Sequence, residues 1–209
     1  MPPGYSLRPA EVSDLDNVLG LIDSAAAWLR TKGTDQWASP WPSASARCER
    51  VLDGLRAGHT WLVTRGARPV ATISFNAEAD PKLWTEFEQD DPSVYVHRLV
   101  VDRGYAGRGI GAGLVDWAAQ RSAQAYGAIW VRIDVWTTNT ALHAYYLSQS
   151  FVPVRCRPQD HPDYPACALF QRKIDPPGAA HMTHPFSVPL EMVVSGESYR
   201  RSGRGTVDG

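Results

Sequence analysis

The sequence lacks the features that would assign it to a membrane or to nucleic acid. No apolar run approaches the length of a membrane span, and the first residues, MPPGYSLRPAEVSD, contain no signal-peptide core. The net charge is −1, so no overall field attracts nucleic acid or an anionic membrane. The one basic cluster, Arg200, Arg201 and Arg204, has no interleaved aromatic residues. We therefore expect no nucleic-acid partner and no membrane partner.

Cysteine is also scarce. Cys48, Cys156 and Cys167 are an odd number, and their spacing is not that of metal ligands. We expect reduced thiols, as in a cytoplasmic protein, and no metal site, although Cys156 and Cys167 could approach each other across a hairpin.

The 209 residues are enough to bury one core, and the first half of the chain shows clear periodic patterns. A capping box at Ser13 and Asp16 starts a predicted helix that runs to about Arg30. Ser43 is the expected cap of a second helix that Gly58 stops. A strand at 5–9 and a hairpin formed by TWLVTR and VATISFN complete this half.

The second half predicts a strand, a loop, a helix and a further strand, and the two strands should be parallel. The expected elements are a strand at 94–101, a helix at 109–126, a strand at 128–136, a helix at 139–149 and closing strands at 151–157 and 166–174. From residue 175 the chain becomes rich in Pro, Gly, Ser and Arg. We expect one domain over 1–174 and a tail over 175–209, in which SVPLEMVVS could dock as a strand.

The loop GYAGRGIGAG, between the strand and the helix, has the composition of an anion site. A strand that enters a helix through glycines presents free backbone N–H groups at the positive end of that helix. The dinucleotide pattern G-x-G-x-x-G does not fit, since Ala112 and Leu114 stand at the sixth positions. Alanine is an allowed variant there, but the loop also lies in the middle of the chain and no acidic residue ends the next strand at the required place. A Walker loop needs lysine where Ile110 follows Gly109. The loop therefore predicts an anion ligand other than those of the two commoner nucleotide motifs.

Two motifs resemble the GNAT superfamily of N-acetyltransferases. VYVHRLVVDRGYAGRGIGAGLVDWA is similar to its acetyl-CoA segment, with Gly109 and Gly111 at the two glycine positions and Ala106 where the family has Gln or Arg. Asn139 is followed by Tyr146 and Phe151 at the family's spacing, with Ser150 in place of the usual glycine. The resemblance covers about residues 5–174. It implies an α/β fold with a mixed, mostly antiparallel central sheet, a splayed parallel strand pair and flanking helices.

The resemblance also implies a reaction and a co-substrate. The acetyl group of acetyl-CoA would pass directly to a small amine or a protein amino group. The backbone of Leu99, Val100 and Val101 would pair with pantetheine, and Asn139 would contact it or only cap its helix. The pyrophosphate would lie on the loop formed by Gly107, Arg108, Gly109, Ile110, Gly111 and Ala112. Because these residues contact only the CoA part, a longer acyl group or a CoA-sensing module without turnover is an alternative.

Two residues are the expected proton carriers. The resemblance assigns the role of general acid to Tyr146, which its donor hydroxyl permits. The alternative is that Tyr146 packs in the core and Tyr145 is exposed, or the reverse. His97 is the predicted base, on a strand whose alternation would place it on one face with Tyr95, Leu99 and Val101. The alternative is a histidine hydrogen-bonded within the sheet.

Acidic residues are further candidates for the base. Glu78, Glu86 and Glu88 are reserve bases in a charged connection, where carboxylates are usually only solvated. Asp134 is expected to pair with Arg132 or Arg98.

Aromatic residues are expected around the acceptor. Tryptophan and carboxylate walls suit a cationic amine, although a tryptophan in a loop is often only a packing anchor. The expected acceptor-site residues are Trp28, Gln36, Trp37, Trp41 and Trp84. Dimers are frequent in the family, so the resemblance leaves a homodimer open.

Overall fold

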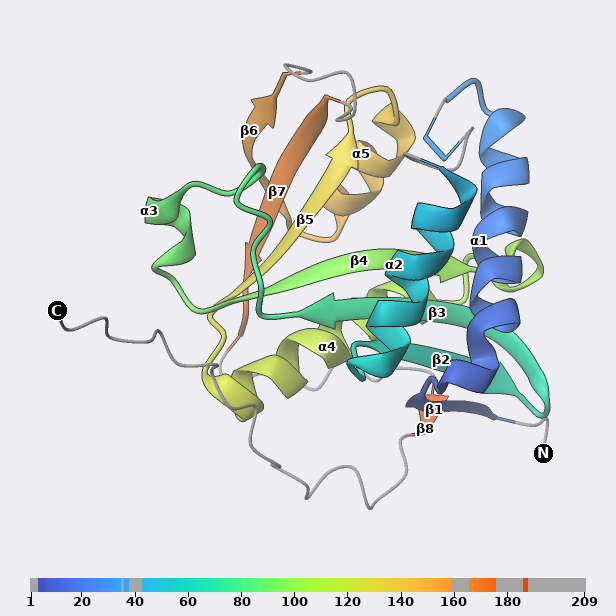
Figure 1. Ribbon diagram of the computed structural model, residues 1–209. Coiled ribbons are helices and arrows are strands. Elements are labelled where there is room, and N and C mark those ends of the chain that lie inside the picture. Colours follow the sequence, from blue (N-terminus) through green and yellow to red (C-terminus); the bar gives the residue numbers. More distant parts are fainter. Residues whose placement is uncertain (1–3, 35, 38–42, 159–165, 176–185, 188–209) are drawn as a thin grey trace, which may run out of the picture.

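The computed structural model describes residues 4–34, 36–37, 43–158, 166–175 and 186–187 (Figure 1). Its elements are β1 (Tyr5–Pro9), η1 (Val12–Asp14), α1 (Leu15–Arg30), α2 (Ala44–Arg56), β2 (Thr60–Arg65), β3 (Arg68–Asn76), α3 (Glu86–Gln89), β4 (Ser93–Val101), η2 (Arg103–Tyr105), α4 (Ile110–Tyr126), β5 (Trp130–Trp136), α5 (Thr140–Ser148), β6 (Val152–Arg157), β7 (Cys167–Lys173) and β8 (Phe186–Ser187).

The strands form one sheet in the order β6-β7-β5-β4-β3-β2-β1-β8. Most neighbours are antiparallel, and the central pair β4–β5 is parallel, as the strand–loop–helix–strand pattern predicted. The predicted fold class, a mixed sheet with a splayed parallel pair and flanking helices, is confirmed.

Helices cover both faces of the sheet (Figure 1), so the core has a layer on each side. One face of the sheet packs against α4, through buried residues such as Leu114 and Ala118. The other face is covered by α1 and α2, where Val18 and Val51 pack on Leu62 of β2. The site described below lies where β4 runs between these layers.

The helix starts follow the sequence with one correction. The Ser43 hydroxyl accepts a hydrogen bond from the Ala46 backbone N–H at 3.1 Å, so the predicted cap of α2 is confirmed. The predicted Ser13–Asp16 box is wrong: the Asp14 carboxylate accepts from the Glu11 N–H at 2.9 Å instead. Arg8 of β1 holds Asp14 in place at 2.7 Å, and this hydrogen bond lowers the pKa of Asp14 to about 2.

The end of the described chain adds an edge strand. β8 pairs in parallel with β1, so Phe186 and Ser187 lie on the domain, while residues 188–195 of the predicted docking strand lie outside the described residues. The expected boundary at 174 and 175 stays a prediction. Cys156 and Cys167 occupy neighbouring strands, one exposed and one buried, and neither forms a disulfide. No helix in the described part of the chain is long and apolar enough to cross a membrane.

Candidate active site

The parallel strands β4 and β5 separate at the centre of the sheet. Their pairing runs from Ser93 and Trp130 to Tyr95 and Arg132, and no further pair follows along the described strands. Beyond that point β4 keeps only its β3 neighbour, with Val100 opposite Thr72. The β5 side of Leu99, Val100 and Val101 therefore presents backbone groups that no described strand pairs. An extended ligand with amide groups can bind such an edge as an added strand.

The glycine loop closes the wider end of this gap. Gly107 and Gly109 both have a φ of 74°, a left-handed backbone conformation that residues other than glycine adopt only with strain. Gly109 is the N-cap of α4, so the first amides of the helix, from Ile110 to Ala112, have no partner within the helix. They form an anion site at the positive end of the helix dipole.

Gly111 is constrained by a close neighbour. A Cβ at this position would lie 3.1 Å from the Tyr145 hydroxyl and 3.7 Å from Val101. The Ile110 side chain is 1% exposed and anchors the helix in the core, so only its backbone is available to a ligand. The side chain of Arg108 is exposed and lies over the Tyr105 ring, 5.4 Å from its centroid, which adds positive charge next to the loop.

Tyr146 and Tyr145 occupy different environments on α5. Tyr146 is 5% exposed and packs against Phe151, with ring centroids 5.2 Å apart. Burial raises the pKa of Tyr146, and the nearby Tyr145 and Asp134 raise it further. Its hydroxyl therefore keeps its proton at neutral pH. It forms no hydrogen bond with any residue that the structure describes. Tyr145 is less buried and faces Gly111.

Asn139 caps α5 and also holds the loop after α1. Its side-chain oxygen accepts from the Leu142 N–H at 3.1 Å, and its amide donates to Gln36 Oε1 at 2.6 Å. Gln36 is 7% exposed and supports Asn139, and its expected place at the acceptor site stays a prediction. The contact of Asn139 with pantetheine stays a prediction.

The predicted alternation of β4 is wrong because the strand contains a β-bulge. Thr72 of β3 lies opposite Val100, but Ser74 lies opposite His97, so β4 has one extra residue. Arg98 adopts a positive φ of 48° at this point. Tyr95 consequently packs with Trp84, whereas Leu99 packs in the α4 layer, on the opposite face. No sequence pattern marked the bulge.

The bulge turns His97 and Arg98 toward one cleft. This cleft, of about 380 Å³, lies between α2 and the strands β3 and β4. Its lining includes Arg50, Gly54, His59, Glu78, His97 and Arg98.

His97 meets Asp134 at the edge of the cleft. The distance from His97 Nδ1 to Asp134 Oδ1 is 3.9 Å, and each side chain is about one-third exposed. Burial and the charge of Arg98 lower the pKa of His97 to about 4, and burial and Asp80 raise the pKa of Asp134 to about 6. The unprotonated forms of both groups are available at neutral pH.

The expected pairing of Asp134 with an arginine is wrong. Arg132 donates to the Tyr95 hydroxyl at 3.1 Å and to the Glu88 carbonyl. Arg98 attracts Asp134 over a longer range, without an ion pair among the described residues. The sequence signal for Asp134 was only that it is the one carboxylate in the predicted strand 128–136.

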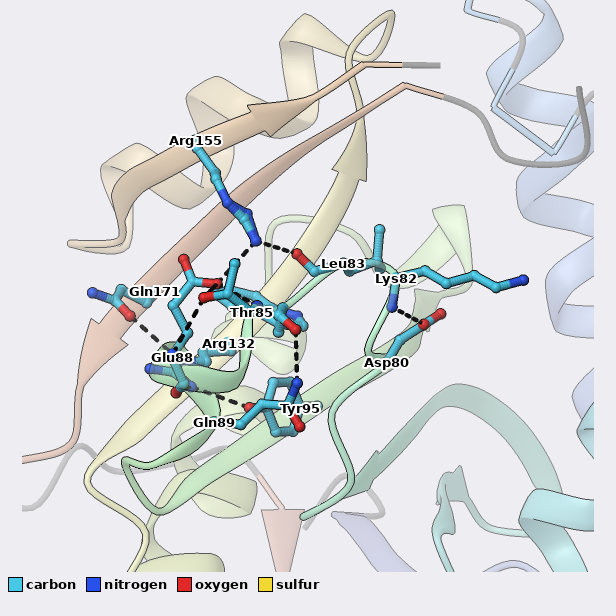
Figure 2. A network of polar contacts seen from close by, with 11 residues as sticks. Asp80, Lys82, Leu83, Thr85, Glu88, Gln89, Tyr95, Arg132, Arg155 and Gln171 are labelled. Atoms are coloured by element: carbon cyan, nitrogen blue, oxygen red, sulfur yellow. Dashed lines mark hydrogen bonds and ion pairs between the residues drawn. The ribbon is translucent and has the colours of Figure 1, made fainter. Parts of the chain in front are cut away.

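A polar network outside the cleft accounts for another part of the expected site (Figure 2). The Glu88 carboxylate accepts from Arg155 at 2.9 Å and from the Thr85 N–H at 2.8 Å. Trp84 is 2% exposed and lies under the Arg132 guanidinium, 5.0 Å from its ring centroid. The expectation that Trp84 lines the acceptor site is therefore wrong, since buried cationic and aromatic neighbours cover it. Glu88 is engaged in structure, and Glu86 is exposed on α3.

The tryptophans near α1 have mixed positions. Arg103 lies 3.8 Å from the ring centroid of Trp28, which connects the end of α1 to the glycine loop. Trp37 packs on the α1–α2 layer of the core, and Trp41 lies outside the described residues. None of these contacts places Trp28 or Trp37 in the lining of the cleft.

Comparison with known proteins agrees with this geometry. The model of the acetyltransferase (GNAT) family matches residues 22–151. The chain belongs to this family. Over 146 residues it is 27% identical to the uncharacterized N-acetyltransferase YesJ of Bacillus subtilis, covering 68% of this chain and 79% of YesJ.

Solved acetyltransferases share the fold. A GNAT-family acetyltransferase from Streptococcus agalactiae has a TM-score of 0.63 at 17% identity, covering 82% of this chain and 96% of its own. The Salmonella typhimurium protein yncA, solved with acetyl-CoA, has a TM-score of 0.58 at 15% identity, covering 86% and 99%. This GNAT protein is therefore an acyltransferase, and acetyl-CoA is its co-substrate.

The residues present fit that co-substrate. The left-handed Gly107 and Gly109 and the tight space at Gly111 keep side chains away from the first amides of α4, where a pyrophosphate would bind. The unpaired edge of Leu99 to Val101 offers partners for pantetheine amides.

Proposed function

We propose that this GNAT protein transfers the acetyl group of acetyl-CoA directly to a primary amine. The observation that carries the proposal is that β4 and β5 separate between the co-substrate side and the amine side of one site. The glycine loop and the open strand edge lie on one side of this opening. The cleft with His97 lies on the α2 side, so an amine there can meet the thioester without an acetyl-enzyme.

The side chains at the opening divide the proton transfers between them. Acetyl-CoA supplies a thioester, and an unprotonated amine can attack the carbonyl carbon of this thioester. Asp134 and His97, 3.9 Å apart, accept the proton that the amine must lose, directly or through water. Tyr146, which is close enough for Asp134 to raise its pKa, keeps its proton at neutral pH and donates it to the leaving thiolate. Holding both reactants in this geometry supplies a large part of the rate.

Tyr146→Phe is the test of this assignment. We expect the variant to bind CoA normally and to transfer acetyl about a hundredfold more slowly, because only the donor hydroxyl is lost. Tyr145→Phe is the matched control, since it removes a neighbouring hydroxyl at the glycine loop. The assay is thiol release from acetyl-CoA with a panel of amines, with the product mass identified.

Each other outcome has a defined meaning. Equal rates for Tyr146→Phe and the native protein would remove Tyr146 as the acid. CoA binding without transfer to any amine would favour a CoA-sensing module. Faster transfer from longer acyl-CoA thioesters would assign a different acyl group to the same site.

A further inference from the structure

We infer that the cleft beside His97 selects small amines that also carry a carboxylate, and that Arg98 binds this carboxylate. The inference rests on the proposed function and names the class of its acceptor. It favours free amino acids over protein amino groups.

Arg98 is a positive charge without a close counter-ion. Its guanidinium makes no hydrogen bond or ion pair with any residue that the structure describes. Burial lowers its pKa, and so does Arg50, which also lines the cleft. An anionic group bound in the cleft would reduce the repulsion between Arg98 and Arg50. It would also accept hydrogen bonds from the Arg98 guanidinium, which is partly removed from water there.

The position of Arg98 requires a strained backbone. A φ of 48° is uncommon for a residue other than glycine, and its cost is of the order of 1 kcal/mol. The bulge orients the side chains of two consecutive residues, His97 and Arg98, toward one cleft, whereas a regular strand would send them to opposite faces. Such strain is concentrated at functional sites.

The wall opposite Arg98 leaves room for its planar head. A Cβ at Gly54 of α2 would lie 3.9 Å from one guanidinium nitrogen of Arg98 and 3.1 Å from the Thr60 hydroxyl. The distance to Arg98 is that of an ordinary van der Waals contact, so α2 lies directly beside the guanidinium, while the tight neighbour of position 54 is Thr60. Gly54 and Arg98 both line the cleft.

The spacing of the charges limits the substrate. His97 and Asp134 receive the ammonium end, and the adjacent Arg98 receives an oxyanion, so both groups must be close together in one molecule. An amino acid has this arrangement. A protein N-terminus has an amide carbonyl where the carboxylate would be, and an arginine binds a neutral carbonyl less strongly than a carboxylate.

Matched pairs of acceptors test the inference. Each pair is an amino acid and its carboxamide. The pairs cover apolar, polar and acidic side chains and both α- and ω-amino groups, and each is assayed with acetyl-CoA by thiol release. The native protein should prefer the best amino acid over its amide by about tenfold or more in kcat/KM. Arg98→Gln should remove most of this preference by raising KM for the amino acid, with little effect on the amide. Arg98→Lys should keep part of it.

Controls separate the inference from other failures. Arg30→Gln removes an exposed charge at the end of α1 and should keep the full preference. Arg98→Asn, a residue that tolerates a left-handed backbone, replaces Arg98→Gln if the latter does not fold. In the native protein, an N-acetyl amino acid should inhibit more strongly than its amide.

Two results would overturn the inference alone: amides acetylated as well as amino acids by the native protein, or an unchanged preference in Arg98→Gln. Transfer to no amine at all would instead contradict the proposed function on which the inference rests.

Discussion

His97 and Asp134 deviate in opposite directions from their ordinary titration, and the cause in each case is burial. Asp134, with its pKa raised from 3.8 to about 6, loses its proton close to neutral pH, while His97, with its pKa lowered to about 4, stays neutral there. We expect kcat/KM to fall as pH decreases below about 6, because the carboxylate becomes protonated. Asp134→Asn should lower kcat/KM and remove this acidic limb. A pH–rate profile with unchanged shape in the variant would exclude Asp134 as part of the base.

The same shift predicts the effect of this substitution on folding. Folded Asp134 binds its proton more tightly than the unfolded chain, so this group makes the protein less stable as pH rises from about 4 to about 6. Asp134→Asn should therefore not lower the melting temperature at neutral pH. A lost activity with an intact or higher Tm would show that the residue serves the reaction and not the fold.

At the scale of elements, Gly109 links the glycine loop after β4 to α4 and has a left-handed φ of 74°. Gly109→Ala should weaken CoA binding and reduce stability by about 1 kcal/mol, because alanine is strained there. Gly20→Ala in α1 is the matched control: its Cβ would have open space, and alanine favours a helix by about 1 kcal/mol. Calorimetry of CoA binding and thermal unfolding measure both effects. An unchanged affinity of Gly109→Ala for CoA would show that the loop does not bind the pyrophosphate.

The elements themselves were largely predictable from the sequence. Periodicity and capping residues such as Ser43 fixed the helices, and the strand–loop–helix–strand pattern predicted the parallel pair. The site was predictable only where a backbone pattern carries it, as at the glycine loop. The β4 bulge, the burial of Trp84 under Arg132 and the meeting of His97 with Asp134 depend on contacts between distant segments. Local propensity does not encode such contacts.

At the scale of the whole molecule, the two proposed binding regions lie on either side of the point where β4 and β5 separate. In the proposed function the loop at the start of α4 and the free edge of β4 bind the co-substrate, and the cleft beside α2 binds the acceptor. The helices α2 and α4 cover opposite faces of the sheet (Figure 1). Direct transfer, as proposed above, requires both ligands to be bound at the same time. This arrangement requires no covalent acetyl-enzyme and predicts that the reaction passes through a ternary complex.

Initial rates measured while both acetyl-CoA and the amine are varied test this central claim most directly. Direct transfer predicts reciprocal plots that intersect, with no acetylated protein detected by intact mass after incubation with acetyl-CoA alone. Parallel plots, together with an acetyl group on the protein, would show ping-pong transfer through an acetyl-enzyme and contradict the account.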